Sequence, residues 1–159
     1  MISKIVVDGW KSNIRFSSAH IIPDYAKCGR LHGHTYAVNA VIIGGMDENG
    51  IIMDFTSFKK HLRDVVESLD HKVLIPARSS HVKIIDKDNS IIVESHDKKY
   101  MFPAQDCVLL PIVSSTAENL AGYILGLLLE KVDFPSRIKS VEIGVDEGFG
   151  QGAFISKDL

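Results

Sequence analysis

Two strand-like segments joined by a short loop carry three of the chain's seven histidines, and they constrain the fold more than any other feature. Segments 14–20 and 32–43 read as β-strands, in which every second side chain shares one face: Ile14, Phe16, Ser18 and His20 in the first, and His32, His34, Tyr36 and Val38 in the second. His32 and His34 lie two residues apart, so a strand projects both imidazoles from one face, with Cα atoms about 6.5–7 Å apart. If the two strands pair as a hairpin, His20 lies opposite them. The pattern predicts an antiparallel pair with three imidazoles on one face.

Three neutral imidazoles around an open fourth position are typical of catalytic zinc sites. A His-x-His pair by itself also occurs as a polar strand edge. The third histidine favours a metal site, and so does Gly33, which removes a side chain from the opposite face of the strand. The residues therefore predict a Zn²⁺ site formed by His20, His32 and His34.

Cys28 lies four residues before His32, in the loop that begins near the predicted metal. Its thiolate can be a fourth ligand, which would make the site closed and structural. It can instead be a nucleophile or base, since a nearby cation favours the reactive thiolate. A buried inert thiol fits poorly with the neighbouring Lys27 and Arg30. Spacing alone leaves both the ligand and the base open.

Two further segments have helical periodicity. An apolar stripe runs through 56–69, and Asp54 is expected to cap this helix. A second helix is expected to begin near Ser115, because Ser115 and Glu118 have capping-box spacing. Capping is the favoured role for Glu118, and a place in a substrate pocket is the alternative.

The remaining strands complete an α+β pattern. Segments 138–147 and 153–156 are expected to form a final strand pair, and the β-branched region within 76–111 is expected to add one or two hairpins. The whole chain, 1–159, is expected to be a single domain with an insertion at about 76–111. The order of elements predicts two helices packed on one face of an antiparallel sheet.

Composition excludes some classes of partner. A net charge of −2 gives no overall electrostatic reason to bind nucleic acid or an anionic membrane surface. The first residues lack the pattern of a secretory signal, and Cys28 and Cys107 do not suggest a disulfide framework. We expect a cytoplasmic protein with reduced thiols.

Six motifs occur in a characteristic order: Phe16–His20, Cys28–His34, Gly50–Phe55, Leu69–His71, Thr116–Asn119 and Val145–Glu147. Together they resemble the signature of the 6-pyruvoyltetrahydropterin synthase and 6-carboxytetrahydropterin synthase family. The resemblance covers nearly the whole chain apart from roughly 76–111. It implies a four-stranded antiparallel sheet with two helices, the tunnelling-type fold. It also implies a homo-oligomer, either a trimer or a hexamer, with active sites at subunit interfaces.

The resemblance also implies roles for individual residues. It assigns zinc to the three histidines, the catalytic thiol to Cys28, and proton transfer to Asp70 and His71. Glu147 would anchor the pterin ring of a small-molecule substrate. On residue chemistry alone, an Asp-His pair at a helix end is usually only a polar terminus. Glu147, by contrast, ends the apolar face of a strand, and a buried carboxylate needs a partner.

The implied substrate is 7,8-dihydroneopterin triphosphate, and two products occur in the family. The three residues between Cys28 and His32 resemble the branch that forms 6-carboxytetrahydropterin for deazaguanine-modified nucleosides. The alternative is 6-pyruvoyltetrahydropterin, which keeps the three-carbon substituent. Lys27 and Arg30 are candidate triphosphate contacts, although a solvated loop explains them equally well. A binding module with a structural zinc site and a generic zinc hydrolase are the competing classes.

Overall fold

Two long antiparallel strands form the centre of the fold in the computed structural model, which describes residues 1–159. They are β3 (His32–Gly44) and β9 (Ile138–Glu147). On either side, β2 (Arg15–His20) pairs with β3, and β10 (Gly152–Asp158) pairs with β9. The resulting antiparallel unit β10-β9-β3-β2 confirms the predicted α+β class, and both hairpins lie where the sequence predicts them.

The sheet is larger than the predicted four strands, because three short strands extend it to seven. β1 (Ser3–Val7) pairs with the far half of β3. β4 (Lys72–Pro76) runs parallel to β2, and β8 (Cys107–Leu110) runs parallel to β4. The sheet is therefore mixed rather than purely antiparallel. These short apolar runs have no alternation, so periodicity does not distinguish them from other buried segments.

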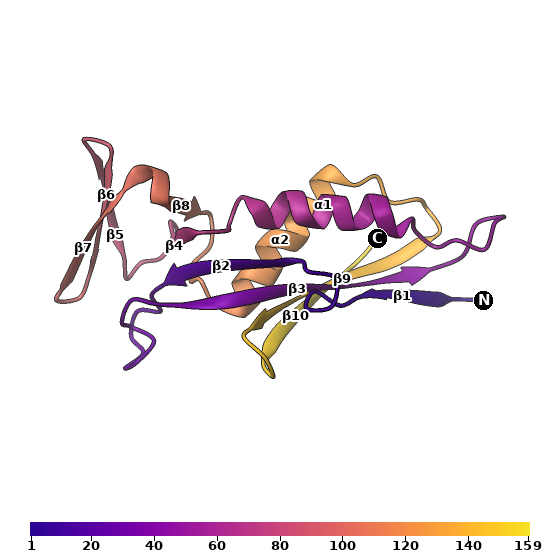
Figure 1. The fold of residues 1–159 in the computed structure, drawn as a ribbon, viewed down its shortest axis with the longest axis horizontal. Helices are drawn as coiled ribbons and strands as arrows, with labels where there is room; N and C mark the ends of the chain where they lie inside the picture. The colour runs from indigo at the N-terminus through magenta and orange to yellow at the C-terminus, as the bar shows by residue number, and fades with distance from the viewer.

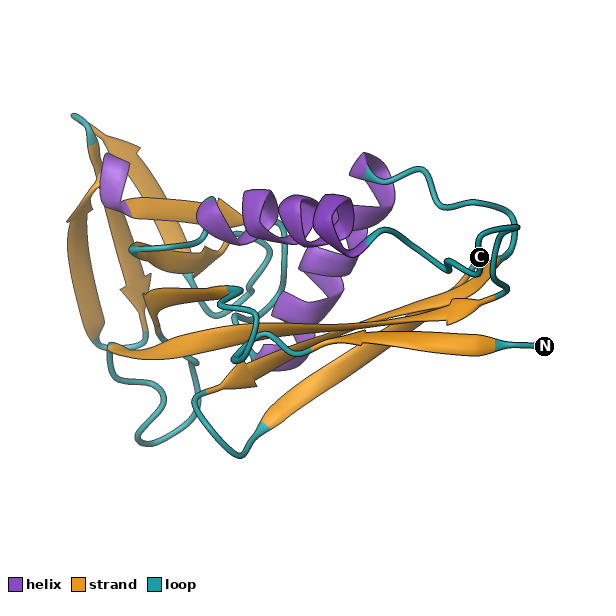
Figure 2. Ribbon diagram, turned by 45° about the vertical axis from the view of Figure 1, so that its right-hand side comes forward, coloured by secondary structure: helices purple, strands orange, loops and turns teal.

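Two helices cover one face of this sheet, as Figures 1 and 2 show. They are α1 (Phe55–Glu67) and α2 (Ala117–Lys131). Asp54 caps α1 as predicted, since its Oδ1 accepts the Ser57 N–H at 2.7 Å. None of the helices combines the length and the apolar character that a membrane span requires. Fully buried side chains of the helices and the sheet form the core: Phe16, Tyr36, Phe58, Leu62, Leu120, Ile124 and Leu128.

The predicted capping box of the second helix is wrong. Thr116 is the N-cap of α2, and its hydroxyl accepts the N–H of Asn119. Ser115 lies one position earlier and is fully buried beneath the sheet's histidines. Glu118 is therefore not the partner of a cap, and it lines the cavity described below.

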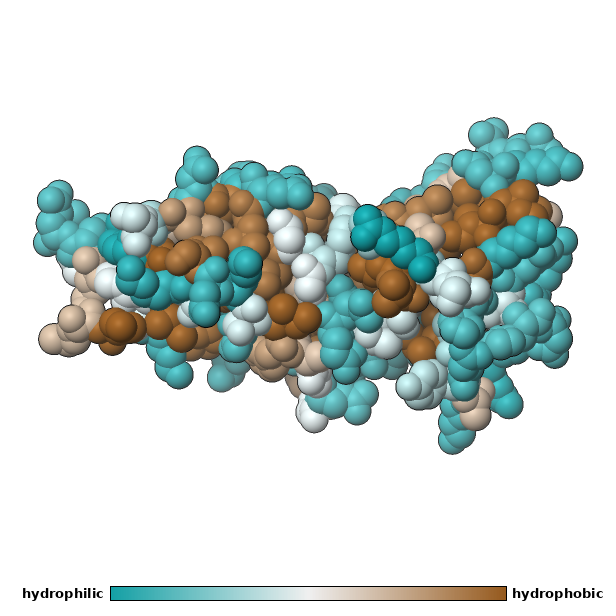
Figure 3. All heavy atoms as spheres, turned by 180° about the vertical axis from the view of Figure 1, so that it is seen from behind, coloured by the Kyte–Doolittle hydropathy of each residue, from teal (hydrophilic) through white to brown (hydrophobic).

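The segment expected to be an insertion contains a separate three-stranded antiparallel sheet at one end of the molecule (Figure 1). Its strands are β5 (Lys83–Lys87), β6 (Ser90–Ser95) and β7 (Lys98–Pro103), followed by the 3-10 helix η1 (Ala104–Asp106). This confirms the predicted hairpins. Seen from behind, a notch in the surface marks the junction with the main body (Figure 3). A small apolar cluster joins the two parts: Ile21, Ile75, Ile91 and Val93.

The packing of α2 predicts opposite effects for two substitutions on this helix. Ile124 is fully buried, so Ile124→Ala should lower the free energy of unfolding by about 2–5 kcal/mol. Gly126 is exposed, and a Cβ there meets no atom within 4 Å, so Gly126→Ala should raise it by about 0.5–1 kcal/mol. Urea denaturation of the two variants measures both changes. A destabilised Gly126→Ala protein would contradict this packing of α2.

Candidate metal centre and adjoining cavity

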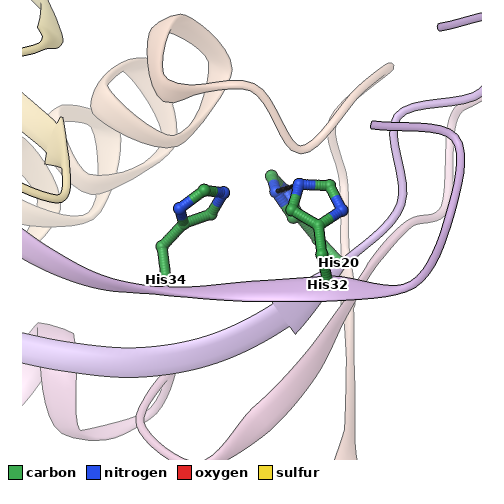
Figure 4. A group of neighbouring side chains, drawn as sticks. All are labelled: His20, His32 and His34. Carbon is green, nitrogen blue, oxygen red and sulfur yellow. Dashed lines mark hydrogen bonds between the residues drawn. The ribbon is translucent and has the colours of Figure 1, made fainter. Parts of the chain in front are cut away.

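The register between β2 and β3 places three histidines on one face of the sheet. His20 is the Cα partner of His32, and Ser18 is the partner of His34. Because side chains alternate along a strand, all three imidazoles project from the same side, as Figure 4 shows. The imidazole nitrogens available as ligands lie within 4.8 Å of one another. The structure thus brings together the three residues that the sequence predicted as metal ligands.

Backbone carbonyls fix the tautomers of two of these rings. Nδ1 of His20 lies 2.9 Å from the carbonyl oxygen of Ser115, and Nδ1 of His32 lies 2.7 Å from that of Arg30. A carbonyl oxygen only accepts, so both Nδ1 atoms donate their proton and both Nε2 atoms present lone pairs. These two Nε2 atoms are 3.1 Å apart (Figure 4). Two acceptors at this distance repel each other unless a cation or an added proton neutralises the repulsion.

The third ring presents a lone polar atom to the same space. Nε2 of His34 is buried and has no hydrogen-bond partner. Buried polar atoms in folded proteins have a hydrogen-bond partner in the great majority of cases, so this unpaired nitrogen indicates a site for a ligand. Together with the oriented Nε2 atoms of His20 and His32, it forms a donor set that fits a transition-metal ion. The thiol of Cys28 is not part of this cluster.

Burial dominates the electrostatics of His20, which is the most buried of the three rings. The pKa of His20 is lowered to about 4, mainly by burial and to a smaller extent by the neighbouring His32 and His34, while the hydrogen bond to Ser115 opposes this shift. The neutral ring, which is the form that ligates a metal, is therefore favoured. Burial, followed by the charge of Glu147, raises the pKa of Tyr36, whose hydroxyl lies 3.3 Å from His20 Nδ1. The side of the cluster formed by His20 and Tyr36 is thus weakly hydrated.

Glu147 links the cluster to a cavity of about 320 Å³. Its Oε1 lies 3.7 Å from Nε2 of His20 and 4.0 Å from Nε2 of His34. Backbone hydrogen bonds from Glu147 to Gln151 and from Gly148 to Thr35 hold this end of β9. Cys28, Glu118 and Glu147 all line the cavity. A thiol and two carboxylates therefore surround the space beside the imidazoles.

Asp70 and His71 lie on the opposite face of the same strand pair. Asp70 Oδ1 accepts the Ser17 N–H at 2.7 Å, and Asp70 Oδ2 accepts the Nδ1–H of His71 at 2.8 Å. Ser17 and Thr35, which alternate with the histidine positions, line a depression together with His71. The His71 side chain is 82% exposed. Neither residue lines the cavity that Cys28 borders, and the depression beside His71 is also lined by His34.

Several residues of the site escape sequence reasoning. The carbonyl groups of Ser115 and Arg30 orient two histidines. Because every residue type has a backbone carbonyl, the sequence does not indicate this role. For Ser115 the sequence indicates only a helix cap, because its spacing from Glu118 is that of a capping box. Gln151 lines the cavity from a turn that the sequence marks only as a connection.

A trio of strand-borne imidazoles beside a cavity that contains a thiol and two carboxylates defines a candidate metalloenzyme. The family model described as 6-pyruvoyl tetrahydropterin synthase matches residues 10–158. A relative from Methanocaldococcus jannaschii carries the provisional name 6-carboxy-5,6,7,8-tetrahydropterin synthase. It is 36% identical over 157 residues, which cover 96% of this protein and 96% of the relative.

Solved structures agree with this match. The 6-pyruvoyl tetrahydropterin synthase of Plasmodium falciparum has a TM-score of 0.93 at 32% identity, and the match covers 99% of both proteins. A catalytic-residue mutant of the Plasmodium vivax enzyme also has a TM-score of 0.93, at 29% identity, over 100% of this protein and 99% of that one. The protein belongs to the 6-pyruvoyl tetrahydropterin synthase family, which confirms the resemblance seen in its motifs.

The close approach at Gly33 predicts a sensitive position in the metal centre. A Cβ added to Gly33 would lie 2.9 Å from the carbonyl oxygen of Ser18, so β2 and β3 would have to move apart. We expect Gly33→Ala to weaken Zn²⁺ binding by about ten- to a hundredfold, as displaced supporting groups do in metal sites. Thr35→Ala, on the outer face of the same strand, is the matched control and should bind normally. Competition with a chromogenic chelator measures both, and equal affinities would refute the strand-spacing argument.

Proposed function

We propose that this protein is a zinc-dependent lyase that converts 7,8-dihydroneopterin triphosphate into 6-carboxy-5,6,7,8-tetrahydropterin, a precursor of deazapurine nucleosides. The observation that carries the proposal is a cavity lined by one thiol and two carboxylates, one of which, Glu147, lies within 4.0 Å of two imidazoles of the three-histidine cluster. A structural zinc site in a binding module has less support, because the Cys28 thiol is not part of the histidine cluster.

Glu147 is proposed to bind the pterin ring. Its carboxylate stands at the end of a buried strand, where it accepts hydrogen bonds from the N–H groups of the amino-pyrimidine edge. The cavity volume of about 320 Å³ is near the lower end of the range for small-molecule sites. A cavity of this volume suits the pterin ring system, and the triphosphate group is proposed to extend from it into solvent. Lys27 and Arg30 are exposed on the adjoining loop and are candidate contacts for it.

Cys28 is proposed as the residue that moves protons on the three-carbon substituent of the substrate. When bound, the zinc ion supplies Lewis acidity to oxygen atoms of that substituent. The Cys28 thiol is exposed and lines the cavity, so it can reach a C–H or O–H group of the substrate. The hydrogen bond from Ile22 N–H to the Cys28 carbonyl holds the thiol's loop against the end of β2.

Asp70 and His71 are proposed to act on the active site of a neighbouring subunit. Burial opposes ionisation of Asp70, but the Ser17 N–H and the His71 imidazole more than compensate, so its pKa is lowered. The carboxylate then holds the Nδ1–H of His71 and leaves Nε2 free to exchange a proton. Since His71 and Cys28 line different cavities of one subunit, we propose that a second copy of the protein supplies this pair.

The surface of the sheet is consistent with such an assembly. β10 and β8 are edge strands with unpaired backbone groups. Apolar patches interrupt the polar surface (Figure 3). Large exposed apolar side chains lie on or beside strands of the sheet: Val6, Leu109, Val113 and Phe154. Edges and patches of this kind favour self-association, and a trimer or a hexamer is the proposed state.

Two observations bear on which of the family's two products is formed. Relatives from Aquifex aeolicus and Bacillus subtilis, at 26% and 27% identity, are named 6-carboxy-5,6,7,8-tetrahydropterin synthase. The three-residue spacing between Cys28 and His32 resembles the same branch. The structurally similar Plasmodium proteins are named for the pyruvoyl product, which makes 6-pyruvoyltetrahydropterin the alternative.

Incubation of the zinc-loaded protein with 7,8-dihydroneopterin triphosphate tests the reaction directly. We expect 6-carboxytetrahydropterin and acetaldehyde by mass spectrometry. Cys28→Ala should lower turnover by at least about a hundredfold, because proton transfer typically contributes that much, and its zinc content should match the wild type. A pyruvoyl product would select the alternative enzyme. Absence of any turnover, or loss of zinc from Cys28→Ala, would refute the assignment of Cys28 as a catalytic thiol.

Mixing two inactive variants tests whether active sites are shared between subunits. Cys28→Ala and His71→Ala should each be inactive alone. Co-refolded in equal amounts, they should recover about a quarter of wild-type activity, because that fraction of random interfaces joins an intact Cys28 to an intact His71. Mixing Cys28→Ala with Cys28→Ser is the control and should recover nothing. Inactive mixtures of the first pair would place all of these groups in one subunit.

A further inference from the structure

A second cluster of potential ligands lies outside the three-histidine centre. Its members are Asp24, His81 and His96, whose ligand atoms all lie within 4.8 Å of one another. They come from three separate segments: the loop after β2, the connection from β4 to β5, and the turn between β6 and β7. Such a convergence of two imidazoles and one carboxylate is a common donor set for divalent transition metals.

The distances in this second cluster are close to those of a metal site. Asp24 Oδ2 lies 3.0 Å from Nδ1 of His81, and Asp24 Oδ1 lies 2.6 Å from Nε2 of His96. Around a tetrahedral ion with bonds of about 2.0–2.1 Å, ligand atoms lie about 3.3 Å apart. Small side-chain rotations therefore suffice to admit an ion. All three side chains are 45–55% exposed, so water can complete the coordination.

The backbone presents these side chains in turn conformations. Asp24 and His96 both have positive φ angles, 71° and 54°. Lys98 donates a hydrogen bond to the Gly29 carbonyl at 2.7 Å, which joins the same two segments a few residues away. Lys98 therefore has a hydrogen-bond acceptor, and the ammonium group of Lys83 lies 3.6 Å from the carboxylate of Glu94, so both nearby cations interact with groups other than Asp24. The cluster is thus positioned by structure that is independent of any ion.

We propose that Asp24, His81 and His96 form a second binding site for a divalent transition-metal ion of the zinc type. The site connects the β5–β7 sheet to the loop that carries Cys28, and the ion clamps the two together. Magnesium and calcium fit poorly, because they prefer oxygen ligands over imidazoles. The clamp is a structural aid to the thiol's loop and stands apart from the proposed reaction chemistry.

Zinc titration of the chelator-stripped, full-length protein tests the site. We expect about two equivalents per subunit, and one equivalent for either His81→Ala or His96→Asn. Asparagine is chosen at position 96 because it tolerates the positive φ. His61→Ala removes a histidine of α1 that belongs to neither cluster, and this control should still bind two equivalents. If His81→Ala and His96→Asn bind as much zinc as the wild type, the proposal is refuted.

His32→Ala separates this proposal from the proposed enzyme function. It should lose one equivalent and retain the second site. If His96→Asn binds less zinc than the wild type but His32→Ala binds as much, the second site is supported and the enzyme proposal fails.

Hydrogen exchange supplies a second readout. In His32→Ala, zinc should slow amide exchange in residues 22–30 by about tenfold, and it should have no effect in His32→Ala/His96→Asn. Equal exchange with and without zinc in His32→Ala would contradict the clamp.

Discussion

The antiparallel register between β2 and β3 is the constraint on which the site depends. It sets His20 opposite His32, and a shift of one residue would turn the whole β2 set to the other face of the sheet. The same register stacks Phe16 on Tyr36 in the core, with ring centroids 4.7 Å apart. Because core packing holds this register, the spacing of the imidazoles is fixed by the fold before any ion binds.

The periodic parts of the molecule could be predicted from sequence, because their physical cause is local. The alternation in 14–20 and 32–43 gave the correct strands and the correct face for three histidines. Asp54 lies directly before an amphipathic helix, and it caps that helix as expected. The insertion's hairpins were equally visible, since β-branched runs and turn residues mark them.

Features that depend on distant contacts could not be predicted. β4 and β8 are strands because they lie beside β2 and each other, and their sequences alone are merely short and apolar. Ser115 has the local signature of a cap, but its burial under His20 makes it a support for that ring instead. The cluster of Asp24, His81 and His96 joins three loops whose proximity no local pattern encodes.

The sheet that carries the histidines has chemistry on both of its faces. Imidazoles point to one side of the β2–β3 pair, and the Asp70–His71 dyad lies on the other, with a single layer of backbone between them. In the proposed ring of subunits, each β2–β3 pair would contribute to two active sites, one on each face of the sheet. In that arrangement, no single subunit would contain a complete active site. In the proposed ring, a defect in one hairpin would then impair two active sites.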